Sequence, residues 1–434
     1  MVLRIAFAIL IAFGTTLCVE AGVAKFYLPP SGDVKTATDP SEAAKLFDAA
    51  KQAATNGEAS NAYRLAFQSL HADPSFEPAR KLLGYVRFRD AWHTPFEVRQ
   101  LSADKVWTKR FGWLPKDHVS RYEKGERYYR GRWMSLENEA KLRSEIAHGW
   151  RVESDHYQIL TNDNLEAGVE LAQKLERLHG VWLQLFAGFV IDKAELVRRF
   201  EGKPPRSRGL KQHQVVYFRD RNQYNATLRS QQPKIDMTLG IYFDNEHKAY
   251  FFAGKDQDNG TLWHEATHQL FSESRPTVRD IGAKSNFWAV EAVACYMESL
   301  QEHLDQGFVT LGEPNAGRLP AACERLLKDN FYVPLAQLVA LGTKDLQADT
   351  RINKIYSQSA GLATFFLDAD DGKYREPFVA YLQAIYNGSA DESTLSKLTK
   401  RSYSELDAEY HSWMKSICTQ ATSEPLPPPP ASAP

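Results

Sequence analysis

Cysteine is scarce in this sequence, with four residues among 434. Such a low content excludes the disulfide-dense scaffolds of small secreted domains, which depend on many bridges. Lys and Arg nearly balance Asp and Glu, and the formal net charge is −1. Because a nucleic-acid-binding domain usually carries a strong basic excess, no nucleic-acid partner is expected. The length and the apolar content of 43% suit a globular protein with room for two domains.

Long apolar runs are also missing beyond the first residues of the chain. The N-terminus has the three parts of a secretory leader: a basic Arg4, an apolar stretch from Ile5 to Leu17, and the small-residue sequence Val19-Glu20-Ala21. We therefore predict a signal peptide over residues 1–21, export to the periplasm or the cell exterior, and no transmembrane segment in the mature chain. Lipid attachment at Cys18 is the disfavoured alternative, because Leu17 stands where a small residue is expected.

The stretch His264-Glu265-Ala266-Thr267-His268 is an H-E-x-x-H motif, which is typical of catalytic zinc sites. On a helix, residues four apart lie on one face, so both imidazoles can reach a single Zn²⁺. Glu265 then lies near the open position of the metal, where a carboxylate can take a proton from water and pass it to a leaving amine. Two solvated histidines on a surface helix are the alternative, but the apolar residues around the motif indicate a buried helix.

A catalytic zinc site needs a third protein ligand, and Glu291 is the strongest candidate. It is the sole acid in the apolar part of a helix-like stretch, residues 286–298, that can fold back on the first helix. A buried lone carboxylate is unfavourable, so the alternative to metal binding is an ion pair with a core arginine. Four further residues are rival ligands, and Glu298 among them also suits an orienting contact to a ligand imidazole. The rivals are Glu273, Asp280, Glu298 and His303.

Together, Trp263-His-Glu-Ala-Thr-His268 and the later Trp288-x-x-Glu291 resemble the gluzincin metallopeptidases of the peptidase MA clan. More narrowly, roughly residues 150–415 are similar to a family of secreted bacterial proteins with a peptidase MA-like domain. The resemblance implies a zincin-like fold and a peptide or protein substrate. It also implies a set of roles: His264, His268 and Glu291 as Zn²⁺ ligands and Glu265 as general base. Thermolysin-like members place Asp where this chain has Cys295, so another residue, with Glu298 the candidate, must support the ligands.

The same resemblance draws attention to Tyr356. In the clan, a Tyr or His from the later helical region often donates a hydrogen bond to the oxyanion. Tyr356 opens an apolar helix predicted over residues 356–367 and is the candidate for this catalytic role. A tyrosine that only packs in the core is the alternative.

We predict an α+β, zincin-like domain over residues 149–418. Its expected elements are a strand at 157–160, a helix over 162–186, a basic loop over 189–212, a strand at 215–218, and a hairpin of 239–243 with 249–252. The edge strand of that hairpin could pair with an extended peptide or be an ordinary edge. After Glu291 the chain is expected to be helical to about residue 415. The Pro-rich tail, 419–434, is expected to be disordered.

Two smaller regions are predicted before this domain. Residues 22–88 hold three helix-like stretches, of which 62–85 resembles one tetratricopeptide unit, and packing on the next segment is favoured over peptide binding. Residues 89–148 hold a repeat marked by Trp92, Trp113 and Trp133, each expected to end a short strand before a helix. These Trp side chains are expected to pack as seams rather than form a ligand cage.

Loss of the leader leaves Cys295, Cys323 and Cys418, so at most one intrachain disulfide can form. Cys295 is expected to be a buried apolar residue, and a Cys323–Cys418 bond is possible in an oxidising compartment. The leading hypothesis is a secreted zinc-dependent metallopeptidase. The alternative is a non-catalytic zincin-fold binding or structural protein of the cell envelope, which could have lost Glu265 and still fold. The sequence carries no signal for the oligomeric state.

Overall fold

A computed structural model of the protein describes residues 23–29, 38–203, 211–255 and 257–423. Helices and strands are both abundant in these residues, and the predicted α+β class is confirmed. The expected leader, residues 1–21, lies outside the described residues. None of the described helices has the length and apolar character needed to cross a membrane.

The centre of the fold is a five-stranded sheet with three parallel strands in the middle and an antiparallel strand at each edge. Side chains of the strand Tyr157–Thr161 alternate between buried and half-buried, as the period of two for a strand requires. The predicted hairpin of residues 239–243 with 249–252 is confirmed, because the strands Ile241–Phe243 and Lys248–Phe252 pair in antiparallel fashion. In spatial order, the strands are β11 (Ile241–Phe243), β12 (Lys248–Phe252), β10 (His213–Phe218), β9 (Tyr157–Thr161) and β8 (Trp150–Glu153).

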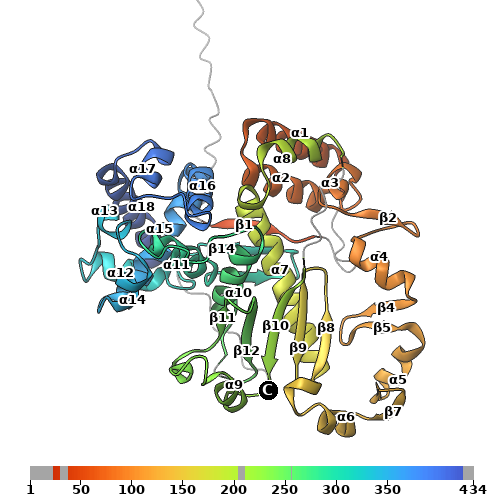
Figure 1. The fold of residues 1–434 in the computed structure, drawn as a ribbon. Coiled ribbons are helices and arrows are strands. Elements are labelled where there is room, and N and C mark those ends of the chain that lie inside the picture. The colour runs from red at the N-terminus through yellow and green to blue at the C-terminus, as the bar shows by residue number, and fades with distance from the viewer. Residues whose placement is uncertain (1–22, 30–37, 204–210, 256, 424–434) are drawn as a thin grey trace, which may run out of the picture.

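Two helices, α7 (Leu165–Val190) and α10 (Asn259–Glu273), lie side by side against this sheet (Figure 1). The long α7 is amphipathic and packs on β8 and β9, whereas α10 packs on β11 and β12. The expected loop over residues 189–212 is partly wrong, because α8 (Lys193–Phe200) forms there. Its start is capped by the Asp192 carboxylate, which accepts from the Glu195 N–H at 2.8 Å.

The region after α11 (Phe287–Met297) is mostly helical, but the expectation of helix alone is wrong. A hairpin of β13 (Gln301–His303) and β14 (Phe308–Leu311) interrupts it, and β1 (Ala24–Tyr27) completes a three-stranded sheet by pairing with β14. These strands are too short to show a clear alternation in sequence. The other α-helices that follow α7 are α9 (Arg221–Leu228), α12 (Leu319–Leu327), α13 (Leu335–Leu338), α14 (Thr343–Ala348), α15 (Ile352–Gly372), α16 (Arg375–Tyr386), α17 (Thr394–Thr399) and α18 (Tyr403–Ser423).

The last helix, α18, extends to Ser423, so the expectation of a disordered tail from residue 419 is wrong for its first residues. Residues 424–434 lie outside the described residues. Cys418 of α18 forms a disulfide with Cys323 of α12, the pairing that the sequence allowed. Cys295 is free and buried in α11, as expected.

The N-terminal helices α1 (Pro40–Asn56), α2 (Ala59–Ala72) and α3 (Glu77–Leu82) sit at one end of α7 (Figure 1). Helix α2 packs directly on α7, and α1 packs on α8. Apolar side chains of these helices share one buried cluster, to which Tyr63 and Phe67 of α2 and Leu196 of α8 belong. The helices therefore dock on the main body, which is the packing role that the sequence favoured.

Residues 86–142 form three hairpin–helix units that follow one another in an arc at the right of Figure 1. The expectation of a single strand before each helix is wrong: residues with positive φ, such as Arg89-Asp90 and Arg130-Gly131, reverse the chain and make a hairpin. The expected Trp seams are confirmed for two of the three tryptophans, because Phe96 packs on Trp113 and Tyr122 on Trp133. The units are β2 (Val86–Phe88), β3 (Ala91–His93) and α4 (Pro95–Ser102); β4 (Lys105–Thr108), β5 (Gly112–Pro115) and α5 (Val119–Glu123); β6 (Glu126–Tyr129), β7 (Arg132–Ser135) and α6 (Leu136–Leu142).

Candidate metal centre

The H-E-x-x-H motif lies on α10, one turn after the helix begins. The Asp258 carboxylate caps the helix by accepting from the Thr261 N–H at 2.6 Å. Trp263 and Leu270 are buried in the core and fix the rotation of the helix. His264 and His268 therefore lie one turn apart on its half-buried side.

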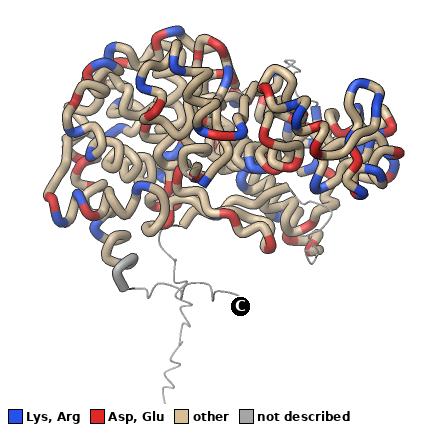
Figure 2. Tube along the Cα trace, turned by 90° about the horizontal axis from the view of Figure 1, so that it is seen from below, with Lys and Arg blue, Asp and Glu red and all other residues tan. Residues whose placement is uncertain are grey.

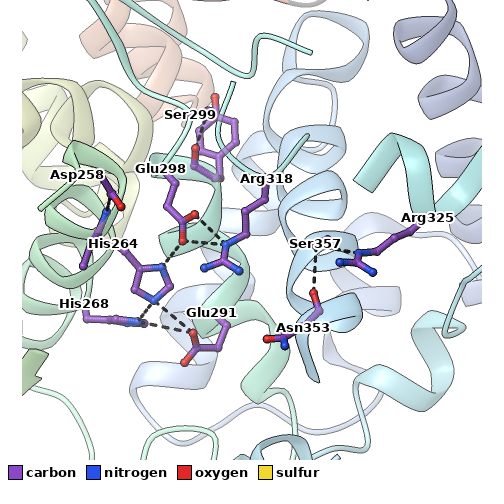
Figure 3. A network of polar contacts seen from close by, with 12 residues as sticks. Asp258, His264, His268, Glu291, Glu298, Ser299, Arg318, Arg325, Asn353 and Ser357 are labelled. Carbon is purple, nitrogen blue, oxygen red and sulfur yellow. Dashed lines mark hydrogen bonds and ion pairs between the residues drawn. The ribbon is translucent and has the colours of Figure 1, made fainter. Parts of the chain in front are cut away.

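Helix α11 supplies the third group. Every residue from Phe287 to Met297 is buried, and Glu291 is the sole acid among them. Because α11 packs directly against α10, the Glu291 carboxylate points toward the two imidazoles (Figure 3). A carboxylate at this depth needs a positive partner, and the two ring nitrogens or an ion between them can provide it.

Three potential ligand atoms converge at this place. The Nε2 atoms of His264 and His268 lie 3.1 Å apart. Oε2 of Glu291 lies 3.5 Å from Nε2 of His264 and 3.8 Å from Nε2 of His268. Ligands of a tetrahedral Zn²⁺ with bonds of about 2.0–2.2 Å lie roughly 3.3–3.6 Å from one another, so the three atoms fit a single ion. Two imidazoles and one carboxylate also leave a fourth coordination position open.

Glu298 contacts His264 at Nδ1, the ring nitrogen that faces away from the other candidate ligand atoms. Its Oε1 lies 2.7 Å from Nδ1 of His264, and both of its oxygens accept from Nε of Arg318, at 2.9 and 2.8 Å (Figure 3). When Nδ1 donates to a carboxylate, Nε2 carries the lone pair that faces the other ligands. The expected contact of Glu298 with an imidazole of the motif is confirmed, whereas the metal-binding role of that imidazole stays a prediction. Cys295 lies beside His264 as well.

The other rival ligands lie in different surroundings. Oε2 of Glu273 contacts Nδ1 of His213 at 2.6 Å, and Nε2 of His303 contacts Oγ1 of Thr310 at 3.2 Å. Asp280 is exposed in the loop between α10 and α11. Within the described part of the chain, none of these three rivals belongs to a cluster of potential metal ligands.

Glu265 lies beside the edge strand of the sheet. The backbone N–H of Tyr242 in β11 donates to Oε2 of Glu265 at 2.9 Å. Burial raises the pKa of Glu265 to about 7, with the His264 charge opposing the shift and the Glu291 charge adding to it. A carboxyl group with a pKa near neutrality can both take up and release a proton at that pH.

The two histidines have opposite pKa shifts. Burial lowers the pKa of His268 to about 4, so its ring is neutral at pH 7 and offers a lone pair. Burial also opposes the charge on His264, but contacts with Cys295, Glu291 and Glu298 raise its pKa well above the ordinary value. These contacts therefore favour the protonated form of His264.

Tyr356 of α15 lies at the same centre. A catalytic role for this tyrosine, as predicted from the sequence, needs this position. Its side chain interacts with the Glu291 carboxylate, and burial and that carboxylate raise the pKa of its hydroxyl. The guanidinium carbon of Arg318 lies 5.7 Å from the centre of its ring. Tyr356 is thus positioned against a candidate ligand.

A pocket with a volume of about 480 Å³ opens beside the centre, with His268 and Glu291 in its wall. Tyr242 of the edge strand lines it too, so the pocket lies between β11 and the candidate ligands. Its apolar wall suits an amino-acid side chain, and the charged residues Arg279 and Lys344 also line it. The apolar lining residues are Ile281, Ala283, Phe287, Val290 and Tyr386.

Arg318 and Tyr242 belong to the site but were not found from the sequence. Arg318 precedes α12 and has no spacing relation to the motif. The available signal was Glu298, a half-buried acid that needs a cation. Tyr242 acts through its backbone N–H, which has no side-chain signature.

No protein-family model matches the chain, and no curated protein is significantly similar to it.

Proposed function

We propose that the protein is a zinc-dependent metallopeptidase of the gluzincin type. The observation that carries this proposal is the convergence of Nε2 of His264, Nε2 of His268 and Oε2 of Glu291 within 3.8 Å of one another. Glu265 lies on the same helix beside an edge strand, where a substrate can approach it. A structural zinc site would instead close the fourth position with another protein ligand.

A zincin-like fold for residues 149–418 is part of this proposal. It is supported by a mixed sheet with an antiparallel edge strand next to the motif helix and by a second helix that carries the later acid. An extended peptide that pairs with β11 would lie directly above Glu265 and the mouth of the pocket. The pocket would then receive a substrate side chain.

The chemistry assigned to this chain is general acid–base catalysis by Glu265. A zinc ion, when bound, supplies Lewis-acid polarisation and makes water acidic near neutral pH. Glu265, held at Oε2 by the Tyr242 N–H, accepts a proton from water and delivers it to the amine that leaves. Tyr356 is the candidate donor to the oxyanion, because it reaches the centre from the side of Glu291.

We also propose that the protein is exported. The leader-like residues 1–21 support this, and so does the Cys323–Cys418 disulfide, because such bonds persist mainly in oxidising compartments. A peptidase that acts on the polypeptides of that compartment would need no further cofactor than Zn²⁺.

The test compares zinc-loaded wild type with Glu265→Gln on an unbiased peptide library, with metal content measured on both proteins. We expect cleavage by wild type, about one bound zinc in each protein, and a rate loss of about 10²–10⁴-fold in the variant. Equal cleavage by both proteins would exclude Glu265 as the base. Zinc-loaded wild type that cleaves no peptide would favour the alternative, a non-catalytic zincin-fold binding or structural protein of the envelope.

A further inference from the structure

The guanidinium of Arg318 contacts a supporting residue on each of two sides of the candidate metal centre. Its Nε donates to both carboxylate oxygens of Glu298, at 2.9 and 2.8 Å, and Oε1 of Glu298 lies 2.7 Å from Nδ1 of His264 (Figure 3). Its guanidinium carbon lies 5.7 Å from the ring centre of Tyr356, whose side chain interacts with Glu291. One side chain is therefore linked to two of the three candidate ligands, each through one intermediate residue.

The backbone before Arg318 is packed tightly against the end of α11. Gly317 has a φ of +54°, and a Cβ at this position would lie 2.8 Å from the backbone nitrogen of Ser299 and 3.1 Å from the carbonyl carbon of Glu298. A residue with a side chain would therefore have to move away from α11. On the other side of Arg318 in sequence, Leu319 begins α12 and is buried in the core. The close approach of the chain at Gly317 thus brings the Arg318 guanidinium to Glu298.

The charge of Arg318 also matters at this centre, to which the carboxylates of Glu265, Glu291 and Glu298 belong. Among the described residues, Arg318 is the one Lys or Arg that forms an ion pair with any of the three. Bound Zn²⁺ would add two positive charges, and Arg318 supplies a third. Figure 2 shows Lys and Arg mixed with Asp and Glu over the molecule, and the formal net charge is −1. The surplus of acids at the centre is therefore a local feature.

We propose that Arg318 is a positioning residue of the metal centre. It holds the Glu298 carboxylate in place, so that His264 presents Nε2 to the ion. It also holds the ring of Tyr356, and through it the Glu291 carboxylate. A carboxylate can orient a ligand imidazole only while its own position is fixed. Without Arg318, Glu298 would keep its contact with His264 alone and could rotate away from that ring. This inference rests on the proposed zinc function.

The sign of the effect on zinc affinity separates positioning from charge. Removal of a nearby cation, taken alone, strengthens the attraction between the remaining carboxylates and a divalent ion. Loss of a group that orients a ligand weakens metal binding instead. We therefore expect Arg318→Gln to bind zinc about 10–100-fold more weakly than wild type. Arg318→Lys keeps a cation for Glu298 but lacks the planar group, so its expected loss is smaller, about three- to tenfold.

The experiment measures zinc affinity by chelator competition on the purified protein, for wild type, both Arg318 variants and a control. The matched control is Arg325→Gln, which removes the same charge from α12, where Nε of Arg325 donates to the neutral hydroxyl of Ser357 at 3.2 Å (Figure 3). Its zinc affinity is expected to stay within about twofold of wild type. Co²⁺ gives a second readout, because its visible absorption depends on the geometry of its ligands. We expect the Co²⁺ spectrum to change in Arg318→Gln and to stay the same in Arg325→Gln.

Thermal unfolding of each metal-free protein shows whether the fold is retained. Zinc binding by Arg318→Gln that is as tight as in wild type, or tighter, would overturn the proposal and leave the zinc site itself supported. Equal losses in Arg325→Gln and Arg318→Gln would overturn it as well. If Arg318→Gln does not fold, Arg318→Lys decides, and an affinity equal to that of wild type counts against the proposal. A wild-type protein that binds no zinc would overturn the proposed function too, so the two failures are distinguishable.

Discussion

The backbone N–H of Tyr242 donates a hydrogen bond of 2.9 Å to Oε2 of Glu265. This contact joins the edge strand β11 to the helix that carries the H-E-x-x-H motif, so the strand and the carboxylate cannot shift independently. Within the described residues, β11 pairs with β12 alone and its second side is unpaired. A polypeptide that adds to this side would lie next to Glu265, because the Tyr242 N–H on this side already donates to that carboxylate.

Glu291 and Glu298 are expected to differ in their effect on zinc affinity. Glu291→Gln removes a candidate ligand and should weaken zinc binding far more than Glu298→Gln, because loss of a group that orients a ligand typically costs 10–100-fold. Chelator competition measures both affinities, and Asp280→Asn in the exposed loop is the control. A larger loss from Glu298→Gln would reassign the third ligand.

Tyr356→Phe separates a catalytic role from a supporting one. Removal of an oxyanion donor typically lowers kcat by about 10²–10³-fold, and we expect a loss of that order with zinc affinity changed by less than about tenfold. Steady-state kinetics and chelator competition on the same protein give both numbers. A large loss of zinc affinity without a separate effect on kcat would mean that the hydroxyl serves Glu291 alone.

The Cys323–Cys418 disulfide should stabilise the C-terminal helices. Replacement of both cysteines by serine is expected to lower the free energy of unfolding by about 2–5 kcal/mol, because the bond constrains the unfolded chain. Denaturant unfolding measures the change. Reduced wild type serves as the comparison and should match the double variant; an oxidised wild type no more stable than the variant would contradict the expectation.

Asp155, in the turn between β8 and β9, should make stability depend on pH. Burial raises its pKa from 3.8 to about 6, with a hydrogen bond from Thr94 opposing the shift. Between these pH values the folded protein holds a proton that the unfolded chain has lost, so stability falls as pH rises through this window. Asp155→Asn should therefore match wild type below about pH 4 and be more stable above pH 6, by up to roughly 3 kcal/mol.

The control for this prediction is Glu153→Gln, because Glu153 is exposed in the adjacent strand. Its substitution is expected to change stability by less than about 0.5 kcal/mol at either pH. Unfolding by denaturant at pH 4 and pH 8 measures all three proteins. An Asp155→Asn protein that is less stable than wild type at pH 8 would show that the ionised carboxylate is favourable in the fold.

Local patterns predicted the parts of the site that are close in sequence. The spacing of His264 and His268 fixes them on one helix face, and the lone acid of an apolar helix singled out Glu291. Arg318 could not be foreseen, because its contact with Glu298 depends on how α12 follows the β13–β14 hairpin. Tertiary contacts of this kind leave no periodic signal along the chain.

The same limit explains the errors in the fold. The Trp repeat was visible, but the first hairpin turns at Arg89 and Asp90, which adopt positive φ without glycine, so this turn was not apparent. Short strands such as β13, with residues Gln301–His303, are set by their partners in the sheet rather than by their own composition. Helix α8 was obscured by the basic residues around it, although Leu196 and Phe200 are spaced to bury one face.

Strand β1 pairs with β14, with Ala24 opposite Leu311. Most of the chain must therefore be synthesised before β1 can pair with β14, so the three-stranded sheet forms late in folding. Phe26 of this strand is buried in the main core, so the segment that would follow leader removal completes the core rather than trailing from it. An uncleaved or truncated N-terminus would thus disturb the β13–β14 hairpin, which follows the helix of Glu291 and is distant in sequence.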